Sequence, residues 1–390
     1  MQINKGMNKM NVYLDNASTT KPSNEVIKEI GLAMEKFYAN PSSIHALGLE
    51  CEKELNKCRE EIAKTINADK NEIYFTSGAS EGNNLILKGL AKAGNEVLVT
   101  PFEHSSIKNT IEVLEENKVR VKYLKIDEKG RIDIEDLKNK ITKETTLVSV
   151  IFVNNEIGVI QNLKEIGIAI KEISSRAKFH VDAVQGFGKI KINVNEMKID
   201  SLVVSGHKLN GPKGIGFCYI TRGLMPKPLI TGGSQERGLR AGTENLPSII
   251  GLNRAIKDAY NNLEENNKKI TEIKKYMIEK LSQINGVKIN SPLDEDFIPH
   301  ILNVSFLGIR GEVLLHALSG DNIYVSTGSA CTSKSKAGVI GSHVLEAIKL
   351  SKEEIEGAIR FSFSKDTTIK EIDYTVNCLE KHLKFLRRKK

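Results

Sequence analysis

The sequence contains no run of about 20 apolar residues, which is the length that a helix needs to cross a membrane. Residues 1–10 mix Asn and Lys and lack the apolar core of a secretory signal, and Met1, Met7 and Met10 are each possible first residues. The sequence also shows no internal repeat and no low-complexity segment. From these absences we expect a cytoplasmic protein without a membrane partner.

The cysteines are too few and wrongly spaced for a metal site or a disulfide framework. There are five, an odd number, and no two are spaced as C-x-x-C, so we expect reduced thiols and no bound metal. Cys51 and Cys58 lie seven residues apart in a helical pattern, and Cys218 lies in the apolar run 215–220, so all three are expected in the core. Cys331 differs, because the small and polar residues around it, 326–338, have little to bury and predict a mobile segment.

Charge is not concentrated in one part of the sequence. The formal net charge is +8, but the lysines are spread along the chain and only the last residues, 384–390, form a basic cluster. A terminal run of charge is more often a solvated end than a binding site. We therefore expect no direct partnership with nucleic acid.

The length predicts two domains, because a single hydrophobic core stops growing at roughly 250 to 300 residues. Between residues 72 and 220, short β-branched runs alternate with amphipathic stretches of helical length, which is typical of a mainly parallel sheet. This pattern indicates a doubly wound α/β domain, which we assign to residues 11–262. The expected strands are 73–76, 96–100, 120–126, 146–153, 179–184, 201–205 and 216–220, and the expected helices are 83–91, 106–115 and 163–174.

The remaining residues, 263–390, are predicted to form a smaller α+β domain that carries the Cys331 segment. A polar helical stretch, 248–281, leads into it. The N-terminal segment, 11–45, could pack on this smaller domain. The expected strands of the smaller domain are 300–306 and 359–363, and its expected helices are 312–318 and 352–357.

The first sequence feature that carries chemistry is a candidate anion site. Residues 76–84 (TSGASEGNN) follow an expected strand and open an expected helix, so backbone N–H groups and the positive end of the helix dipole face outward. The Ser80 hydroxyl can add a bond to a phosphate. Thr-Ser-Gly at a strand end is also ordinary turn chemistry, and the pattern alone does not decide between the two.

Two further features, Asp182 and Lys208, lie near the C-terminal ends of expected strands, where ligands of α/β sheets bind. A buried aspartate needs a positive partner such as a protonated pyridine nitrogen, although a strand-end Asp more commonly caps a turn. A lysine there can form a Schiff base, and burial beside another cation would favour its neutral amine, although a single lysine is more often solvated. The order of phosphate loop, Asp182 and Lys208 favours the chemical interpretation.

Short motifs along nearly the whole chain resemble those of one enzyme family. They are YLDNASTT (13–20), NPSSIH (40–45), EH (103–104), NNEIG (154–158), SGHK (205–208), GPKG (211–214), RAGT (240–243) and GSACTS (328–333). In this order they resemble fold-type I pyridoxal-phosphate enzymes of the class V aminotransferase group, and more narrowly the NifS/IscS-type cysteine desulfurases. Each motif is short, and the specificity lies in the set.

The resemblance implies roles for individual residues. Lys208 would hold pyridoxal 5'-phosphate as a Schiff base, Asp182 would pair with the pyridinium nitrogen and Gln185 would bond the ring hydroxyl. His104 would stack on the ring and carry protons, although a His at a strand–helix boundary is usually only a cap or a packing residue. Asn155 and Arg360 would bind the substrate carboxylate, for which a planar guanidinium is suited. The phosphate would be held by Ala79, Ser80, Ser205 and His207, joined by Thr243 from the other subunit of a homodimer.

The resemblance also implies a reaction. L-cysteine would be converted to L-alanine, with Lys208 taking the Cα proton and the Cys331 thiolate taking the sulfur as a persulfide. The sulfur would pass to an acceptor protein, either an iron-sulfur cluster scaffold or a tRNA-thiolation enzyme. Two alternatives stay open: a selenocysteine lyase or another pyridoxal-phosphate enzyme of this fold, and a non-catalytic sulfur-relay or scaffold protein.

Overall fold

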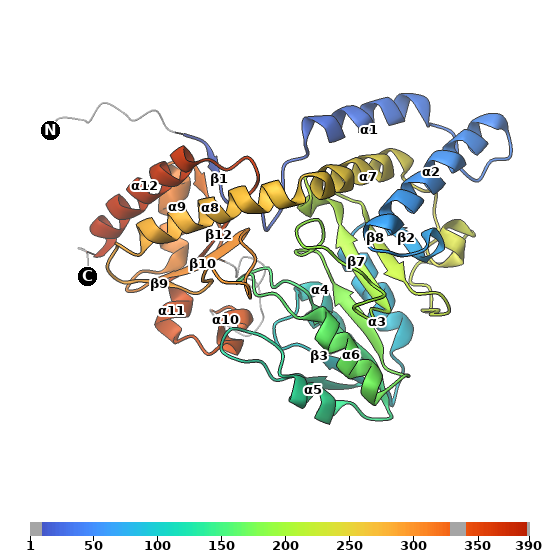
Figure 1. Cartoon of the computed structure of the whole chain (residues 1–390), viewed down its shortest axis with the longest axis horizontal. Coiled ribbons are helices and arrows are strands. Elements are labelled where there is room, and N and C mark those ends of the chain that lie inside the picture. Colours follow the sequence, from blue (N-terminus) through green and yellow to red (C-terminus); the bar gives the residue numbers. More distant parts are fainter. Residues whose placement is uncertain (1–9, 328–340, 388–390) are drawn as a thin grey trace. The chain divides into compact units, whose positions relative to one another are not determined.

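The computed structural model describes residues 10–327 and 341–387. This part of the chain forms two compact units (Figure 1). The large unit comprises Thr20–Asn154 and Ile160–Leu263, and the small unit comprises the residues up to Thr19, Asn155–Val159 and the residues from Glu264. We expected a large domain of 11–262; the observed large unit ends at Leu263, and residues 10–19 and 155–159 belong to the small unit.

The large unit is built on a seven-stranded sheet that is mainly parallel, as the sequence predicted. Strands β4, β3, β5, β6 and β7 run parallel, whereas β8 is antiparallel to both of its neighbours, β7 and β2. All residues of β3, β7 and β8 are buried, which fits their β-branched and apolar composition. In spatial order the strands are β2 (Ile73–Thr76), β8 (Gly216–Ile220), β7 (Ser201–Ser205), β6 (Lys178–Asp182), β5 (Thr145–Ile151), β3 (Glu96–Val99) and β4 (Arg120–Tyr123).

Helices pack on this sheet, and one apolar cluster joins α3 and α4 to strands β3, β7 and β8. Helix α3 begins at Ala79, four residues before the expected start at 83, because the small residues that suggested a loop form its first turn. The helices of the large unit are α1 (Asn24–Lys36), α2 (Ala46–Thr65), α3 (Ala79–Leu90), α4 (Ser105–Glu116), α5 (Ile134–Lys140), α6 (Leu163–Ile173) and α7 (Leu246–Asn261).

The small unit combines a three-stranded antiparallel sheet, ordered β12, β10 and β9, with a short parallel pair of β1 and β11. Its core is a separate apolar cluster that includes residues of α8, α9 and α12. The strands are β1 (Val12–Tyr13), β9 (Val287–Ile289), β10 (Ile301–Phe306), β11 (Ile323–Tyr324) and β12 (Ala358–Ser362), and the helices are α8 (Leu263–Leu281), α9 (Gly311–Gly320), α10 (His343–Ala347), α11 (Lys352–Glu356) and α12 (Ile369–Arg387).

The helical stretch predicted over 248–281 is helical in the structure except at Asn262. Two helices cover these residues, because α7 ends at Asn261 and α8 begins at Leu263. Asn262 between them donates its side-chain amide to the carbonyl of Asp258 at 3.0 Å. Asn side chains compete with the backbone for such bonds, which favours a helix end.

Three of the cysteine predictions are confirmed. Cys51, Cys58 and Cys218 are buried free thiols, as is Cys378. Among the described residues, no helix combines the length and the apolar character needed to cross a membrane.

Candidate active site

Two neighbouring strands of the large unit end at residues that the sequence analysis selected. β6 ends at Asp182 and β7 ends at Ser205, and the two strands run parallel. Ser205 is followed directly by a 3₁₀ turn, Gly206–Lys208, which carries Lys208 as its last residue. Because the C-terminal ends of parallel neighbours meet at one edge of a sheet, Asp182 and Lys208 lie at the same edge.

The start of α3 has the properties of an anion site. Gly78 precedes the helix with a φ of 152°, a region that favours glycine, and no described side chain caps the first turn. The N–H groups of Ala79 and Ser80 therefore point out of the positive end of the helix. A Cβ at Gly78 would lie 3.5 Å from the Ser205 hydroxyl, so Ser205 is beside this helix end. The geometry fits a phosphate at this point.

Asp182 presents a buried carboxylate, since the residue is 2% exposed. Its Oδ1 accepts a hydrogen bond of 3.1 Å from the N–H of Val184, and its Oδ2 accepts one of 2.9 Å from Nδ2 of Asn83. Within the described ranges, no Lys, Arg or His forms an ion pair with Asp182. A buried carboxylate without a cation is costly, and a protonated ring nitrogen would supply the missing charge. The residues present therefore fit pyridoxal phosphate.

His104 is both a helix cap and a neighbour of this carboxylate. It precedes α4, and its Nδ1 accepts the N–H of Ser106 at 3.2 Å and lies 2.9 Å from the Ser106 hydroxyl. Burial lowers the pKa of His104; the negative charge of Asp182 opposes this effect and the positive charge of Lys208 adds to it. The capping and chemical interpretations are compatible, because Nε2 makes no hydrogen bond to a described residue.

A second lysine beside Lys208 was missed by the sequence analysis. Burial, and then the positive charge of Lys208, lower the pKa of Lys189 to about 7. The Lys189 ammonium donates a hydrogen bond of 3.3 Å to Oε1 of the buried Gln185. No sequence pattern marks Lys189, because a lysine in a turn is ordinarily solvated.

His207 lies in the same electrostatic environment. Burial lowers its pKa to about 4, and the positive charges of Lys208 and Lys213 contribute in the same direction. The imidazole of His207 is therefore neutral near pH 7. A neutral ring nitrogen can donate one hydrogen bond to a phosphate without adding charge to the site.

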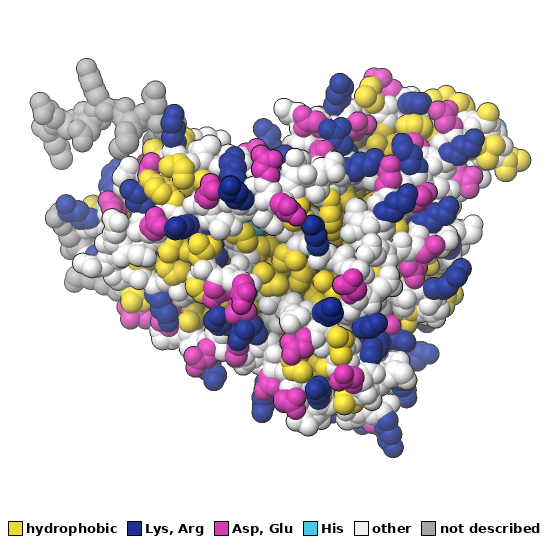
Figure 2. All heavy atoms as spheres, viewed as in Figure 1, with side chains coloured by type: hydrophobic (Ala, Val, Ile, Leu, Met, Phe, Trp, Pro, Cys, Tyr) yellow, Lys and Arg dark blue, Asp and Glu magenta, His cyan; other side chains and the backbone are white. Residues whose placement is uncertain are grey.

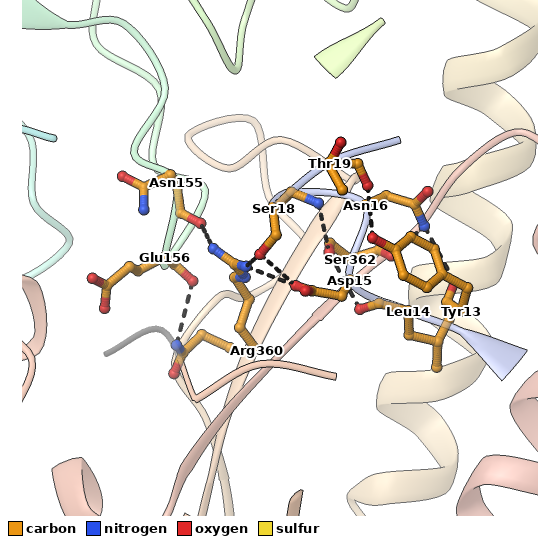
Figure 3. Close-up of polar contacts among 12 residues, drawn as sticks. Tyr13, Leu14, Asp15, Asn16, Ser18, Thr19, Asn155, Glu156, Arg360 and Ser362 are labelled. Carbon is orange, nitrogen blue, oxygen red and sulfur yellow. Dashed lines mark hydrogen bonds and ion pairs between the residues drawn. The ribbon is translucent and has the colours of Figure 1, made fainter. Parts of the chain in front are cut away.

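In the small unit, Arg360 lies at the centre of a polar cluster (Figure 3). The residue comes from β12 and is 4% exposed, and its Nη1 donates to the backbone carbonyl of Asn155 at 2.8 Å. Its Nη2 donates to Oδ1 of Asp15 at 2.8 Å and to the hydroxyl of Ser18 at 2.6 Å. The structure thus brings Arg360 and Asn155 together. Their role toward a substrate carboxylate stays a prediction.

Asp15 was not selected from the sequence, although it lies in the first family-like motif. It occupies one donor group of the Arg360 guanidinium, whereas Nε of Arg360 has no partner among the described residues. An incoming carboxylate can therefore use the remaining donors or displace Asp15.

The predicted cross-subunit residue, Thr243, is exposed on the large unit and makes no hydrogen bond to another described residue. The segment before it is anchored, because Nε of Arg240 donates to Oε1 of Glu81 at 3.0 Å. Oε2 of Glu81 in turn accepts the N–H of Ser77 at 2.8 Å. The RAGT motif is thus tied to the first turn of α3.

Cys331 lies outside the described residues together with the rest of its motif, and its role stays a prediction. Among the residues that the structure does describe, no three His, Cys, Asp or Glu side chains are grouped as metal ligands would be.

Comparisons with known proteins agree along nearly the whole chain. The model of the family described as "Aminotransferase class-V" matches residues 12–375. The protein named cysteine desulfurase IscS from Clostridium botulinum (strain Hall) is 44% identical over 384 residues, which cover 97% of this chain and 95% of the relative. The protein of the same name from Rickettsia prowazekii is 43% identical over 385 residues, which cover 97% of this chain and 92% of the relative.

Solved structures show the same similarity. A structure titled NifS-like protein aligns with a TM-score of 0.90 at 37% identity, covering 96% of this chain and all 100% of that one. A structure titled SspA in complex with cysteine aligns with a TM-score of 0.79 at 33% identity, covering 92% and 100% of the two chains.

Proposed function

The chain belongs to the aminotransferase class-V family, and we propose that it is a cysteine desulfurase that uses pyridoxal 5'-phosphate. It converts L-cysteine to L-alanine and transfers the sulfur to Cys331. The observation that carries the proposal is the match to relatives named cysteine desulfurase over 97% of this chain. The large unit supports it, because the parallel strands β6 and β7 bring Asp182 and Lys208 to the same edge of the sheet.

Residues of the large unit form the cofactor site. Lys208 would hold pyridoxal phosphate in the resting enzyme, and the cofactor would supply an electron sink for bond breaking at the substrate Cα. Asp182 balances the charge of the protonated ring nitrogen, and Gln185 bonds the ring hydroxyl. The phosphate is bound by the N–H groups at the start of α3, by the neighbouring hydroxyls and by the neutral His207. These groups are Ala79, Ser80, Ser205 and His207, with Thr243 of a second subunit.

Arg360 and Asn155 bind the substrate carboxylate, and the amine of Lys208 takes the Cα proton. Cys331 then acts as the sulfur acceptor. Its thiolate attacks the sulfur of the substrate, the carbon–sulfur bond breaks and a sulfur–sulfur bond forms. The electron pair stays with the carbon side, which is protonated and leaves as alanine. The electrons balance without an added oxidant.

The active form is proposed to be a homodimer. Seven large apolar side chains between residues 27 and 49 are exposed. Among them, Met34 is 62% exposed and Ile44 is 94% exposed. Figure 2 shows yellow side chains over α1 and α2 of the large unit. Patches of this kind mark association surfaces. Thr243 is also exposed, which agrees with its predicted contact to a second subunit. A light-scattering mass of one chain for the active enzyme would refute the dimer.

The sulfur is proposed to pass from Cys331 to an acceptor protein, either an iron-sulfur scaffold or a tRNA-thiolation enzyme. A persulfide carrier needs a reduced thiol at rest, which favours the cytoplasm as its compartment.

The test of the activity is a product balance. The purified protein with bound cofactor is incubated with L-cysteine and a reductant, and sulfide and alanine are measured together. Equal amounts of both are expected. Pyruvate and ammonia in place of alanine would refute desulfuration by sulfur transfer. A parallel incubation with selenocysteine distinguishes the lyase alternative, for which activity would be confined to the selenium substrate.

A further inference from the structure

A buried chain of hydrogen bonds starts from Asn83 in the second turn of α3. Asn83 is fully buried, and its Nδ2 donates to Oδ2 of Asp182 at 2.9 Å and to the hydroxyl of Ser106 at 2.8 Å. Its Oδ1 lies 2.9 Å from Nε2 of His180, another fully buried residue. One side chain thus contacts three groups from β6 and from the start of α4.

The chemistry of the partners fixes the direction of each bond. A carboxylate only accepts, so the amide nitrogen of Asn83 must face Asp182, and its oxygen must face His180. Burial lowers the pKa of His180 to about 3, so its ring is neutral and carries its proton on Nε2, facing that oxygen. Both Nδ2 protons of Asn83 are then used, one on Asp182 and one on Ser106.

The hydrogen bonds run in the same donor-to-acceptor direction from Ser106 to His104. The Ser106 hydroxyl accepts a hydrogen bond from Asn83 and therefore donates its own hydrogen bond to Nδ1 of His104, 2.9 Å away. The backbone N–H of Ser106 donates to the same nitrogen at 3.2 Å. Nδ1 of His104 is thus an acceptor of two donors. The proton of the neutral ring has to be on Nε2, the nitrogen without a partner among the described residues.

We propose that Asn83 is a positioning residue with two tasks: it orients the Asp182 carboxylate, and through Ser106 it holds His104 in the tautomer that carries its proton on Nε2. Nε2 of His104 is then a hydrogen-bond donor. The ring cannot take a second proton on Nδ1 without losing the two bonds from Ser106.

This proposal deepens the proposed function, on which its meaning for catalysis rests, but its geometry can be tested without activity. Asn83 lies on the same helix as the predicted phosphate site at Ala79 and Ser80. One rigid helix would therefore position the phosphate, the Asp182 carboxylate and His104 together. Because one helix holds these groups in place, cofactor binding has to remove less conformational freedom from their side chains.

The experiment compares three variants of the full chain: Asn83→Ala, Ser106→Ala and, as a matched control, Asn84→Ala. Asn84 is the next residue on the same helix and bonds instead to the carbonyl of Ser80 and to Thr110. The first readout is the ¹⁵N chemical shifts of Nδ1 and Nε2 in histidine-labelled, cofactor-free protein, with the His104 signals assigned from a His104→Asn sample. The second is the dissociation constant for pyridoxal phosphate.

In the wild type, Nδ1 of His104 should have the shift of an unprotonated ring nitrogen and Nε2 that of a protonated one. Loss of one hydrogen bond should change the tautomer ratio by roughly tenfold in both Asn83→Ala and Ser106→Ala. Only Asn83→Ala should also weaken cofactor binding, by about tenfold, because it alone loses the bond to Asp182. Asn84→Ala should leave the His104 tautomer ratio as it is in the wild type.

Two results would overturn the proposal. One is a protonated Nδ1 on His104 in the wild type. The other is an unchanged His104 tautomer in both Asn83→Ala and Ser106→Ala. A wild-type protein that shows the expected shifts but releases no sulfide would instead refute the proposed function and leave the tautomer assignment standing.

Discussion

The sharpest stability prediction concerns the ion pair between Arg59 of α2 and Glu236. Each residue is 4% exposed, and the two nitrogens of the guanidinium bond the two carboxylate oxygens at 2.7 and 2.9 Å. The same carboxylate accepts the N–H of Phe75 at 2.9 Å. Glu236 and Arg237 both have left-handed φ angles, 47° and 56°, so this strained segment depends on its contacts.

Arg59→Met would leave Glu236 buried without its cation. Breaking a buried pair in this way costs about 3–5 kcal/mol, because the remaining charge is uncompensated. Each kcal/mol lowers the unfolding midpoint of a domain of this size by roughly 2–4 °C, so a decrease of about 10 °C is expected for the large unit. The carbonyl of Ile73, which Arg59 also bonds, keeps a donor in Arg237 at 2.7 Å and should add little to this loss.

The assay is a thermal melt of a double-mutant cycle. Glu236→Gln, added to Arg59→Met, removes the unpaired negative charge but keeps an oxygen for the N–H of Phe75. The double variant should recover at least half of the decrease in the unfolding midpoint. Lys64→Met is the matched control, since Lys64 is on the same helix and pairs with Glu60 on the exposed surface. It should melt like the wild type. A double variant less stable than Arg59→Met would refute the reasoning.

Three further predictions follow from the sites described. Lys208→Ala should purify without the visible absorbance of bound cofactor, and borohydride reduction of the wild type should attach the cofactor to the peptide that contains Lys208; a label on another lysine would exclude the assignment. Arg360→Lys should raise KM for cysteine by about tenfold or more, because the planar fork that binds a carboxylate is lost, but it should not alter turnover of cysteamine, which has no carboxylate. Burial lowers the pKa of His180 to about 3 from the unfolded value of 6.5, so the folded state binds fewer protons between these values and the unfolding free energy should decrease as pH falls through this window. His180→Gln should flatten that decrease, and an equally steep pH dependence in the variant would count against a neutral buried imidazole.

Strands bounded by clear turn residues were predictable from the sequence. The bounds of β2, β7 and β8 match the expected ranges 73–76, 201–205 and 216–220. β4 was predicted to continue to residue 126 but ends at Tyr123, because it lies at the sheet edge and pairs with β3 alone. The local hydrophobic pattern therefore predicted where the strands lie, and the hydrogen-bonded neighbours of each strand determined where it ends.

The candidate site was predictable where strand ends carry it and not where distant side chains meet. Asp182 ends β6 and Lys208 closely follows its parallel neighbour β7, so the sequence could place them together. Asn83 lies 99 residues from Asp182, and Arg59 lies 177 residues from Glu236. One sequence holds no local signal for contacts across such separations. Asn83 and Lys189 therefore became visible only in the folded chain.

Transfer of the sulfur of cysteine to Cys331 is the step that defines the proposed activity. The most direct measurement is the mass of the Cys331 peptide after the wild-type enzyme has reacted with L-cysteine in the absence of reductant. That peptide should gain one sulfur atom, which reductant should remove. No such gain is expected on the peptides of Cys51, Cys58, Cys218 or Cys378. Cys331→Ala should still bind the cofactor but release sulfide and alanine only at background levels. Sulfide release from Cys331→Ala at the wild-type rate, with no persulfide on the wild-type peptide, would rule out sulfur transfer to Cys331.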